Sequence, residues 1–211
     1  LNKKYSYNND FISFKKPPKF RTDEIALNYE QVEIIYNHDF TKNKRLERVR
    51  DLFVFGCTTG MRYGNYSKIS RSDIDGDFIR VIDLKSKSKN LAIPLNSISK
   101  SILEKYDYNL PNITNQKMNE YIKEVFQELE FTDEIKKTMK YGDELVEMKS
   151  EFWERISSHT ARRSFITIMK NKRVPDKVIM SYTGHTSLEV FNNYYRPSEE
   201  DKVNYMNEVF K

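Results

Sequence analysis

Five side chains suited to phosphate chemistry stand in three short segments of this chain. The segments read TTGMRYGN at 58–65, SSHTARRSF at 157–165 and TGHTSLEVFNNYYR at 183–196, and the side chains are Arg62, His159, Arg162, His185 and Tyr194. Arginines clamp phosphate oxygens through forked, permanently charged donors. Histidines donate to such oxygens or move protons, and a tyrosine hydroxyl can attack phosphorus to form a covalent intermediate. These residue types together indicate nucleophilic attack on a phosphate ester.

The spacing of His159 and Arg162 predicts that they share one face at the start of a helix. Residues three apart are neighbours on a helix surface, and Ser157 or Ser158 can cap this helix. The helix N-terminus adds backbone amides and the positive end of the helix dipole, so we expect a phosphate pocket here. Arg163 points about 100° away from Arg162, which predicts a structural role for it.

The two other segments are expected to reach the same pocket through tight junctions. Gly60 lets the chain turn sharply after a buried helix and bring Arg62 inward. Gly184 precedes His185 in a similar junction, and the pair Thr186 and Glu189 predicts a capping box that holds the histidine against the next helix.

Tyr194 and Tyr195 compete for the role of nucleophile. Leu188, Phe191 and Tyr195 follow the apolar stripe of a predicted helix, which makes Tyr195 the better packing residue. Tyr194 lies off the centre of that stripe, so we favour it as the nucleophile. The alternative is that both tyrosines belong to the core, since the chain contains 14 of them.

Composition places the chain among globular proteins and favours an anionic partner, with an ordinary basic surface as the alternative. Its 211 residues carry a net charge of +5 and an isoelectric point near 9.0, which favours DNA without proving it. No apolar run approaches the ~20 residues of a membrane span. The single cysteine, Cys57, excludes an internal disulfide and a cysteine-based zinc site and fits a reducing cytoplasm. Leu1 in place of methionine suggests a fragment of a longer protein.

The predicted fold class is mixed α/β, predominantly α-helical with a small antiparallel β-sheet. Residues 1–24 contain Pro17-Pro18 and suggest an extended linker from a missing N-terminal DNA-binding domain, followed by a domain over 25–211. Residues 131–154 are poorly patterned and predict irregular structure or a short hairpin. We expect strands at 76–85 and 89–95, and helices from Asn28 through YEQVEIIYN and at 44–57, 98–106, 115–130, 159–172, 175–182, 187–195 and 199–210.

The three segments resemble the motifs of the tyrosine recombinase, or phage integrase, family. The family has a TG-x-R box, an H-x-x-R box and a GH box, with the nucleophilic tyrosine nine residues after the GH histidine. Here these read Thr59-Gly60-Met61-Arg62, His159-Thr160-Ala161-Arg162, and Gly184-His185 followed by Tyr194. The resemblance covers roughly residues 25–211 and implies the catalytic-domain fold of that family.

The resemblance also implies a lysine on a strand hairpin that acts as general acid toward the leaving 5′ oxygen. Lys85, at the end of FIRVIDLK, is the first choice, and Lys87 and Lys89 remain alternatives because the hairpin can be registered differently. Asn65 stands where the family usually has an acidic residue three after the arginine. An amide can still accept a hydrogen bond from Arg62 but adds no charge.

By resemblance, the reaction is metal-independent DNA breaking and rejoining through a 3′-phosphotyrosyl intermediate, with no cofactor. The implied partners are double-stranded DNA, copies of this chain in a tetramer on paired sites, and accessory DNA-bending proteins, in the cytoplasm of a bacterium. The tail helix at 199–210 is expected to dock on a neighbouring protomer. Two rival interpretations are a DNA-binding protein that has lost cleavage and a type IB topoisomerase that relaxes DNA without site choice.

Overall fold

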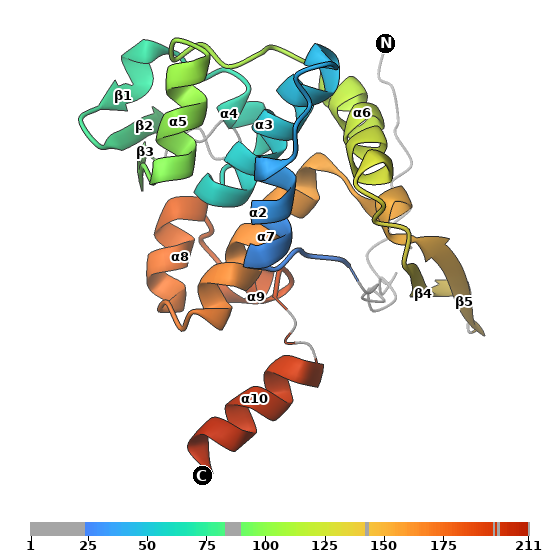
Figure 1. The fold of residues 1–211 in the computed structure, drawn as a ribbon. Helices are drawn as coiled ribbons and strands as arrows, with labels where there is room; N and C mark the ends of the chain where they lie inside the picture. Colours follow the sequence, from blue (N-terminus) through green and yellow to red (C-terminus); the bar gives the residue numbers. More distant parts are fainter. Residues whose placement is uncertain (1–23, 83–89, 142–143, 196, 198, 211) are drawn as a thin grey trace, which may run out of the picture.

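The structure of this chain, a computed structural model, describes residues 24–82, 90–141, 144–195, 197 and 199–210. It is mostly helical with two small antiparallel sheets, which confirms the predicted fold class (Figure 1). The helices are α2 (Tyr29–Asn37), α3 (Lys44–Thr59), α4 (Tyr63–Tyr66), α5 (Ser97–Lys105), α6 (Asn115–Glu128), α7 (Ser158–Asn171), α8 (Asp176–Thr183), α9 (Leu188–Asn192) and α10 (Glu199–Val209), with 3-10 turns at η1 (Arg71–Asp73) and η2 (Phe152–Arg155). The strands are β1 (Ile74–Asp75), β2 (Phe78–Ile82), β3 (Asn90–Pro94), β4 (Glu134–Tyr141) and β5 (Glu144–Glu151).

Helix α3 lies at the centre of the fold and contacts α2, α5, α6 and α7. Asn43 caps its start by accepting the Leu46 N–H, and Gly60 ends it in the left-handed conformation, with φ at 67°. A Cβ atom at Gly60 would lie 2.3 Å from the Phe165 ring of α7. Both the backbone angle and the close packing therefore require glycine, and they fix Arg62 just beyond the end of α3.

Strands β1, β2 and β3 form one antiparallel sheet in that order. Ile79 of β2 pairs with Ile93 of β3, and both are buried in the main core, as the alternating pattern of the two strands predicts. The Ser/Lys-rich connection between β2 and β3 lies outside the described residues. The three candidate lysines of that connection, Lys85, Lys87 and Lys89, therefore lie outside them as well.

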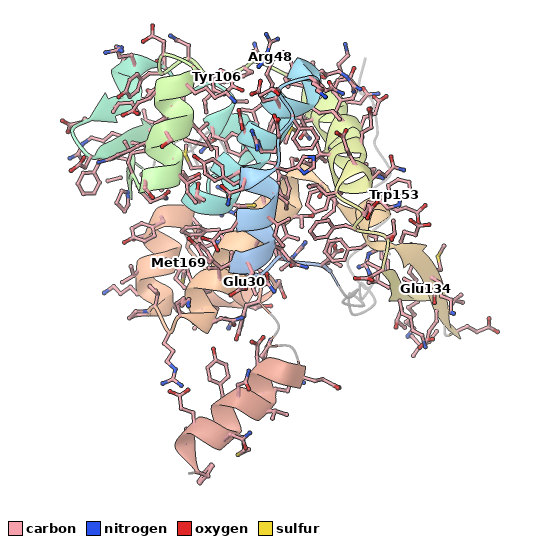
Figure 2. All side chains as sticks on the ribbon, viewed as in Figure 1. Glu30, Arg48, Tyr106, Glu134, Trp153 and Met169 are labelled. Carbon is pink, nitrogen blue, oxygen red and sulfur yellow. The ribbon has the colours of Figure 1, made fainter. Side chains whose placement is uncertain are left out.

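Strands β4 and β5 form a hairpin in the segment where the sequence predicted either irregular structure or a hairpin. Figure 1 shows this hairpin projecting from the body of the molecule below α6, and Figure 2 shows Trp153 of η2 near its junction with the body. Ion pairs Lys136–Glu147 and Lys149–Glu134 cross between the two strands. These cross-strand pairs stabilise a ribbon that packs little against the body.

The start of the described chain is tied to helix α7. Asn28 caps α2 at the predicted start of this helix, through a capping box with Gln31. The backbone N–H of Leu27 donates to Ser164 Oγ of α7 at 2.9 Å, and the Leu27 side chain is fully buried. This bond holds the segment before α2 against α7.

Helices α7, α8 and α9 enclose a second, smaller core of Phe165, Ile166, Ile179 and Phe191. Helix α9 covers 188–192 and is therefore shorter than predicted. Ser187 caps it by accepting the Val190 N–H, so the predicted capping box of Thr186 and Glu189 is wrong. Two good capping residues are adjacent here, and the hydroxyl nearer to the helix takes the bond.

Helix α10 stands apart from the rest of the described chain (Figure 1). Its contacts with the body are made at the end of α7: Asn171 Nδ2 donates to Asp201 Oδ1 at 3.2 Å, the Tyr205 hydroxyl donates to the carbonyls of Lys170 and Asn171 at 3.5 and 3.4 Å, and Arg173 pairs with Glu208. The apolar stripe of α10 is exposed, and it consists of Val203, Met206, Val209 and the following Phe210. None of the described helices is both long and apolar enough to span a bilayer.

Candidate active site

Arg162 joins all three motif segments. Its side chain is 1% exposed, Nη1 donates to the Gly60 carbonyl at 2.9 Å, and Nη2 donates to the Thr183 carbonyl at 2.6 Å. Nη2 also lies 3.2 Å from Nε2 of His185. The forked, planar guanidinium can satisfy several partners in one plane, which lysine cannot do. Segments distant in the sequence therefore meet at one buried cation.

His185 is held in a single tautomer by its neighbours. The Thr183 hydroxyl donates to the Ile179 carbonyl at 2.9 Å, so its oxygen is left to accept from Nδ1 of His185, which is also 2.9 Å away. Nη2 of Arg162 lies 3.2 Å from Nε2 and 3.4 Å from Nδ1, and with Nδ1 carrying the proton only Nε2 can accept from the guanidinium, which can only donate. His185 is 6% exposed, so this contact with Arg162 is buried.

The ring of Tyr194 lies among the candidate residues. Its centroid is 5.1 Å from the His159 ring and 4.7 Å from the His185 ring, and the Arg162 guanidinium carbon is 5.7 Å away. Tyr195 points elsewhere: its hydroxyl donates to Asn171 Oδ1 at 3.0 Å. The two neighbouring tyrosines thus separate, with Tyr194 beside the histidines and Tyr195 against α7, although both also pack against the core of Phe165, Ile166, Ile179 and Phe191.

A pocket of about 360 Å³ opens between α4, α6 and the start of α7. Three predicted residues line it: Arg62, His159 and Arg162. Two asparagines of α6 complete the wall, and both hold Ser158: Asn119 Oδ1 accepts its N–H at 2.7 Å, and Asn115 Oδ1 accepts its hydroxyl at 2.8 Å. The pocket is cationic and large enough for a phosphodiester.

The start of α7 has one of the two predicted cap residues, but its first helical N–H does not face the pocket as predicted. Ser157 is the cap residue, which is one of the two alternatives, and its partner in the capping box is Thr160. The first helical N–H, that of Ser158, is bonded to Asn119 and does not face the pocket as a donor. This backbone amide is therefore not available to an anion in the pocket, whose cationic lining consists of Arg62 and Arg162.

His159 lies in a field of positive charge. Desolvation, as the largest cause, and the nearby charges of Arg163, Arg162 and Arg62 together lower its pKa from 6.5 to about 4. The residue is exposed to solvent, so water screens part of this effect. The ring is therefore neutral at pH 7 and can accept a proton, and a bound phosphate would oppose the charges that depress its pKa.

The sequence did not reveal two sets of side chains that lie at the site, Arg163 and a pair of asparagines of α6. Arg163 was assigned a structural role on another face of the helix, yet its guanidinium carbon is 5.8 Å from the centre of the Tyr194 ring. The α6 asparagines Asn115 and Asn119 carry no motif at all. Only the packing of α6 and of the Tyr194 turn against α7 brings these side chains to the site.

The chain belongs to the phage integrase family, which matches it over residues 26–201. No curated protein matches it in sequence. Its fold is similar to that of solved recombinases, among them XerA recombinase, with a TM-score of 0.66 and 14% identity over 92% of this chain and 66% of that one. A lambda integrase dimer bound to a core site matches with a TM-score of 0.61 and 16% identity over 90% of this chain and 64% of that one. The Tn1549 transposon integrase in complex with a circular intermediate DNA matches with a TM-score of 0.62 and 15% identity over 89% of this chain and 66% of that one. The chain thus spans 64 to 66% of the length of these three structures.

Proposed function

We propose that this chain is the catalytic domain of a site-specific tyrosine recombinase, which cuts and rejoins double-stranded DNA. One observation carries the proposal: the Tyr194 ring packs against His159 and His185 beside Arg162, the buried cation that joins the three motif segments. Tyr194 and His185 do not themselves line the cationic pocket, but His159 and Arg162 do. A packing role alone does not explain why a tyrosine in a turn should meet two histidines and this buried arginine.

In the proposed reaction the phenol oxygen of Tyr194 attacks phosphorus. A bond forms between that oxygen and phosphorus, the bond to the 5′ oxygen breaks, and a 3′-phosphotyrosyl link remains. His159, neutral at pH 7, takes the phenol proton, and Lys85 supplies a proton to the departing 5′ oxygen. Arg62 and Arg162 stabilise the negative charge that grows on the non-bridging oxygens. A free 5′-hydroxyl from a second strand then reverses the step.

The assembly proposed for this chain follows from its exposed tail. Residues 25–211 would form the catalytic domain, with 1–24 as the linker from an upstream DNA-binding domain. The apolar stripe of α10, including Met206 at 61% exposure and Phe210 at 75%, needs a surface to cover it. We expect it to dock on a neighbouring copy in a tetramer on paired sites, with accessory DNA-bending proteins, on the DNA of a bacterial cytoplasm.

The proposal is tested by measuring whether the chain forms a covalent adduct with nicked duplex DNA. The DNA carries a site that is first selected from random sequences by its binding to the chain. The nick lets the cleaved fragment diffuse away and traps the phosphotyrosyl link. The native chain should form the adduct, Tyr194→Phe should bind the DNA but form none, and Tyr195→Phe is the matched control that should retain it. An adduct that survives in Tyr194→Phe and disappears in Tyr195→Phe would move the nucleophile by one residue. Binding without any adduct would favour a non-cleaving DNA-binding protein, and relaxation of arbitrary supercoiled plasmid would favour a topoisomerase.

A further inference from the structure

Arg163 forms a bridge between the start of the described chain and the Tyr194 ring. Its side chain is only 13% exposed, and Nη1 lies 3.6 Å from Oε2 of Glu24. On the same side chain, the guanidinium carbon is 5.8 Å from the centre of the Tyr194 ring. A cation at that distance from a ring is attracted by its π electrons. One arginine therefore links a carboxylate outside α7 to the proposed nucleophile.

The Tyr194 ring borders open space on this side. A cleft of about 620 Å³ is lined by Glu24, Arg163 and Tyr194, together with residues of α2, α7 and the start of α10. Tyr194 itself follows the end of α9 and is held by a turn, in which its N–H donates to the Phe191 carbonyl at 2.9 Å. No helix fixes the backbone of Tyr194, and the cleft provides space next to its ring. The ring can therefore swing away from the histidines into the cleft.

We infer that Arg163 is a positioning residue that holds the Tyr194 ring against His159 and His185, and that Glu24 acts by fixing the Arg163 guanidinium. This role rests on the proposed function, in which Tyr194 is the nucleophile. Attack requires the hydroxyl to stay near the phosphate, and small displacements of a reacting group are costly to the rate. The pair of Glu24 and Arg163 restricts the ring to the productive side of the cleft.

The anchor for this pair is built into the fold. The Leu27 N–H donates to Ser164 Oγ, which fixes the chain three residues after Glu24 to the residue that follows Arg163. Ser164 in turn donates to the Thr160 carbonyl at 2.8 Å and is fully buried. The Glu24 backbone is therefore held close to α7, although its side chain is 45% exposed.

The cleavage test compares variants at Arg163 with a chemically matched pair elsewhere in the molecule. Arg163→Ala should slow single-turnover adduct formation about 10-fold at saturating DNA, as loss of a partly buried cation–ring contact predicts, with little change in DNA affinity. Arg163→Lys keeps a cation over the ring and should stay within about 3-fold of the native rate. The control is Arg71→Ala, because Arg71 also pairs with a carboxylate, that of Asp107, and lies 4.6 Å from the centre of the Tyr108 ring, in η1. Equal rates for the native chain and Arg163→Ala would overturn the inference.

The role of Glu24 is tested by a double-mutant cycle. Glu24→Gln should slow adduct formation less than Arg163→Ala does, and adding it to Arg163→Ala should change nothing further, because Glu24 acts only through the arginine. Asp107→Asn is its matched control and should leave the rate unchanged. Additive losses from Glu24→Gln and Arg163→Ala would refute the coupling.

A measurement without DNA separates failure of this inference from failure of the proposed function. The chain has three histidines, so their ring NMR signals can be assigned by substitution. The Tyr194 ring shifts the signals of His159 and His185 through its ring current, whereas His38 packs on Phe40 and serves as an internal control. In Arg163→Ala the His185 signal should move toward its position in Tyr194→Leu, while His38 stays in place. His185 decides the result, because the charge of Arg163 also acts directly on His159. An unmoved His185 signal would overturn the positioning role whether or not the chain cuts DNA.

Discussion

Arg162→Lys should disable this protein although it preserves the charge. The native guanidinium is 1% exposed and donates to the carbonyls of Gly60 and Thr183 while it contacts His185. A single ammonium cannot reach both carbonyls in the geometry of the fork, so at least one buried acceptor loses its donor. An unsatisfied buried acceptor costs about 1–3 kcal/mol, which lowers the unfolding midpoint of a chain of this size by about 2–12 °C.

The effect on cleavage should exceed the effect on stability. Loss of one preorganised donor to a developing oxyanion costs about 100- to 1000-fold in rate, and we expect a fall of that size in adduct formation below the melting temperature. The matched control is Arg50→Lys, since Arg50 is 7% exposed and, far from the pocket, donates from Nη1 to the carbonyls of Ile35, Tyr36 and His38 and from Nε to Asp51. Arg50→Lys should lose comparable stability and keep its cleavage rate. If both variants lost cleavage equally, or if Arg162→Lys cut within about 3-fold of the native rate, the fork would not be the catalytic feature we describe.

Four further outcomes are expected. Gly60→Ala forces a side chain into the left-handed region and against the Phe165 ring, so it should destabilise by more than about 2 kcal/mol in urea unfolding, and an unchanged midpoint would contradict the packing at that turn. The NMR titration of His159 should have a midpoint below 6.5, and this midpoint should rise when DNA binds. Because His159 takes up its proton at a higher pH in the unfolded state than in the folded state, the free energy of unfolding should fall as pH drops from about 6.5 toward 4. A midpoint at or above 6.5 would rule out the cationic field. Adduct formation should persist in excess chelator, because the two pocket arginines supply the positive charge, and a strict requirement for magnesium would defeat that chemistry. Deleting residues 199–211 should spare binding of one copy to a half-site but weaken the pairing of sites, and normal recombination by the truncated chain would disprove docking of the tail in trans.

Local signals in the sequence were sufficient to predict most of the helices and to single out the motif residues. The capping box of Asn28 and Gln31 fixes where α2 starts, and the glycine at Gly60 fixes where α3 ends, because each depends only on residues within one turn. The same local rules failed at α9, where adjacent Thr186 and Ser187 can both cap a helix and Ser187 is the one that accepts the Val190 N–H.

The hairpin β4–β5 is a second element that the pattern of apolar and polar residues did not predict uniquely. Both strands carry charged residues on a ribbon that is largely exposed, so no buried face imposes an alternation on the sequence. Its existence was one of two predicted outcomes, and its register of Glu134 opposite Glu151 became visible only in the structure.

The sequence by itself determined which residues are candidates for the chemistry, since residue type and short spacing are properties of the chain alone: two arginines, two histidines and a tyrosine in three motifs. Tertiary structure decided how they meet. Arg162 binds carbonyls that lie 102 and 21 residues away in the chain, and no local rule could pair them. It also decided that Arg163, which helix geometry alone turns away from Arg162, still reaches Tyr194, because the turn after α9 carries the ring around the side of α7. The direction in which a side chain leaves a helix follows from the helical period. Contact between helices depends instead on how the chain folds back on itself in three dimensions.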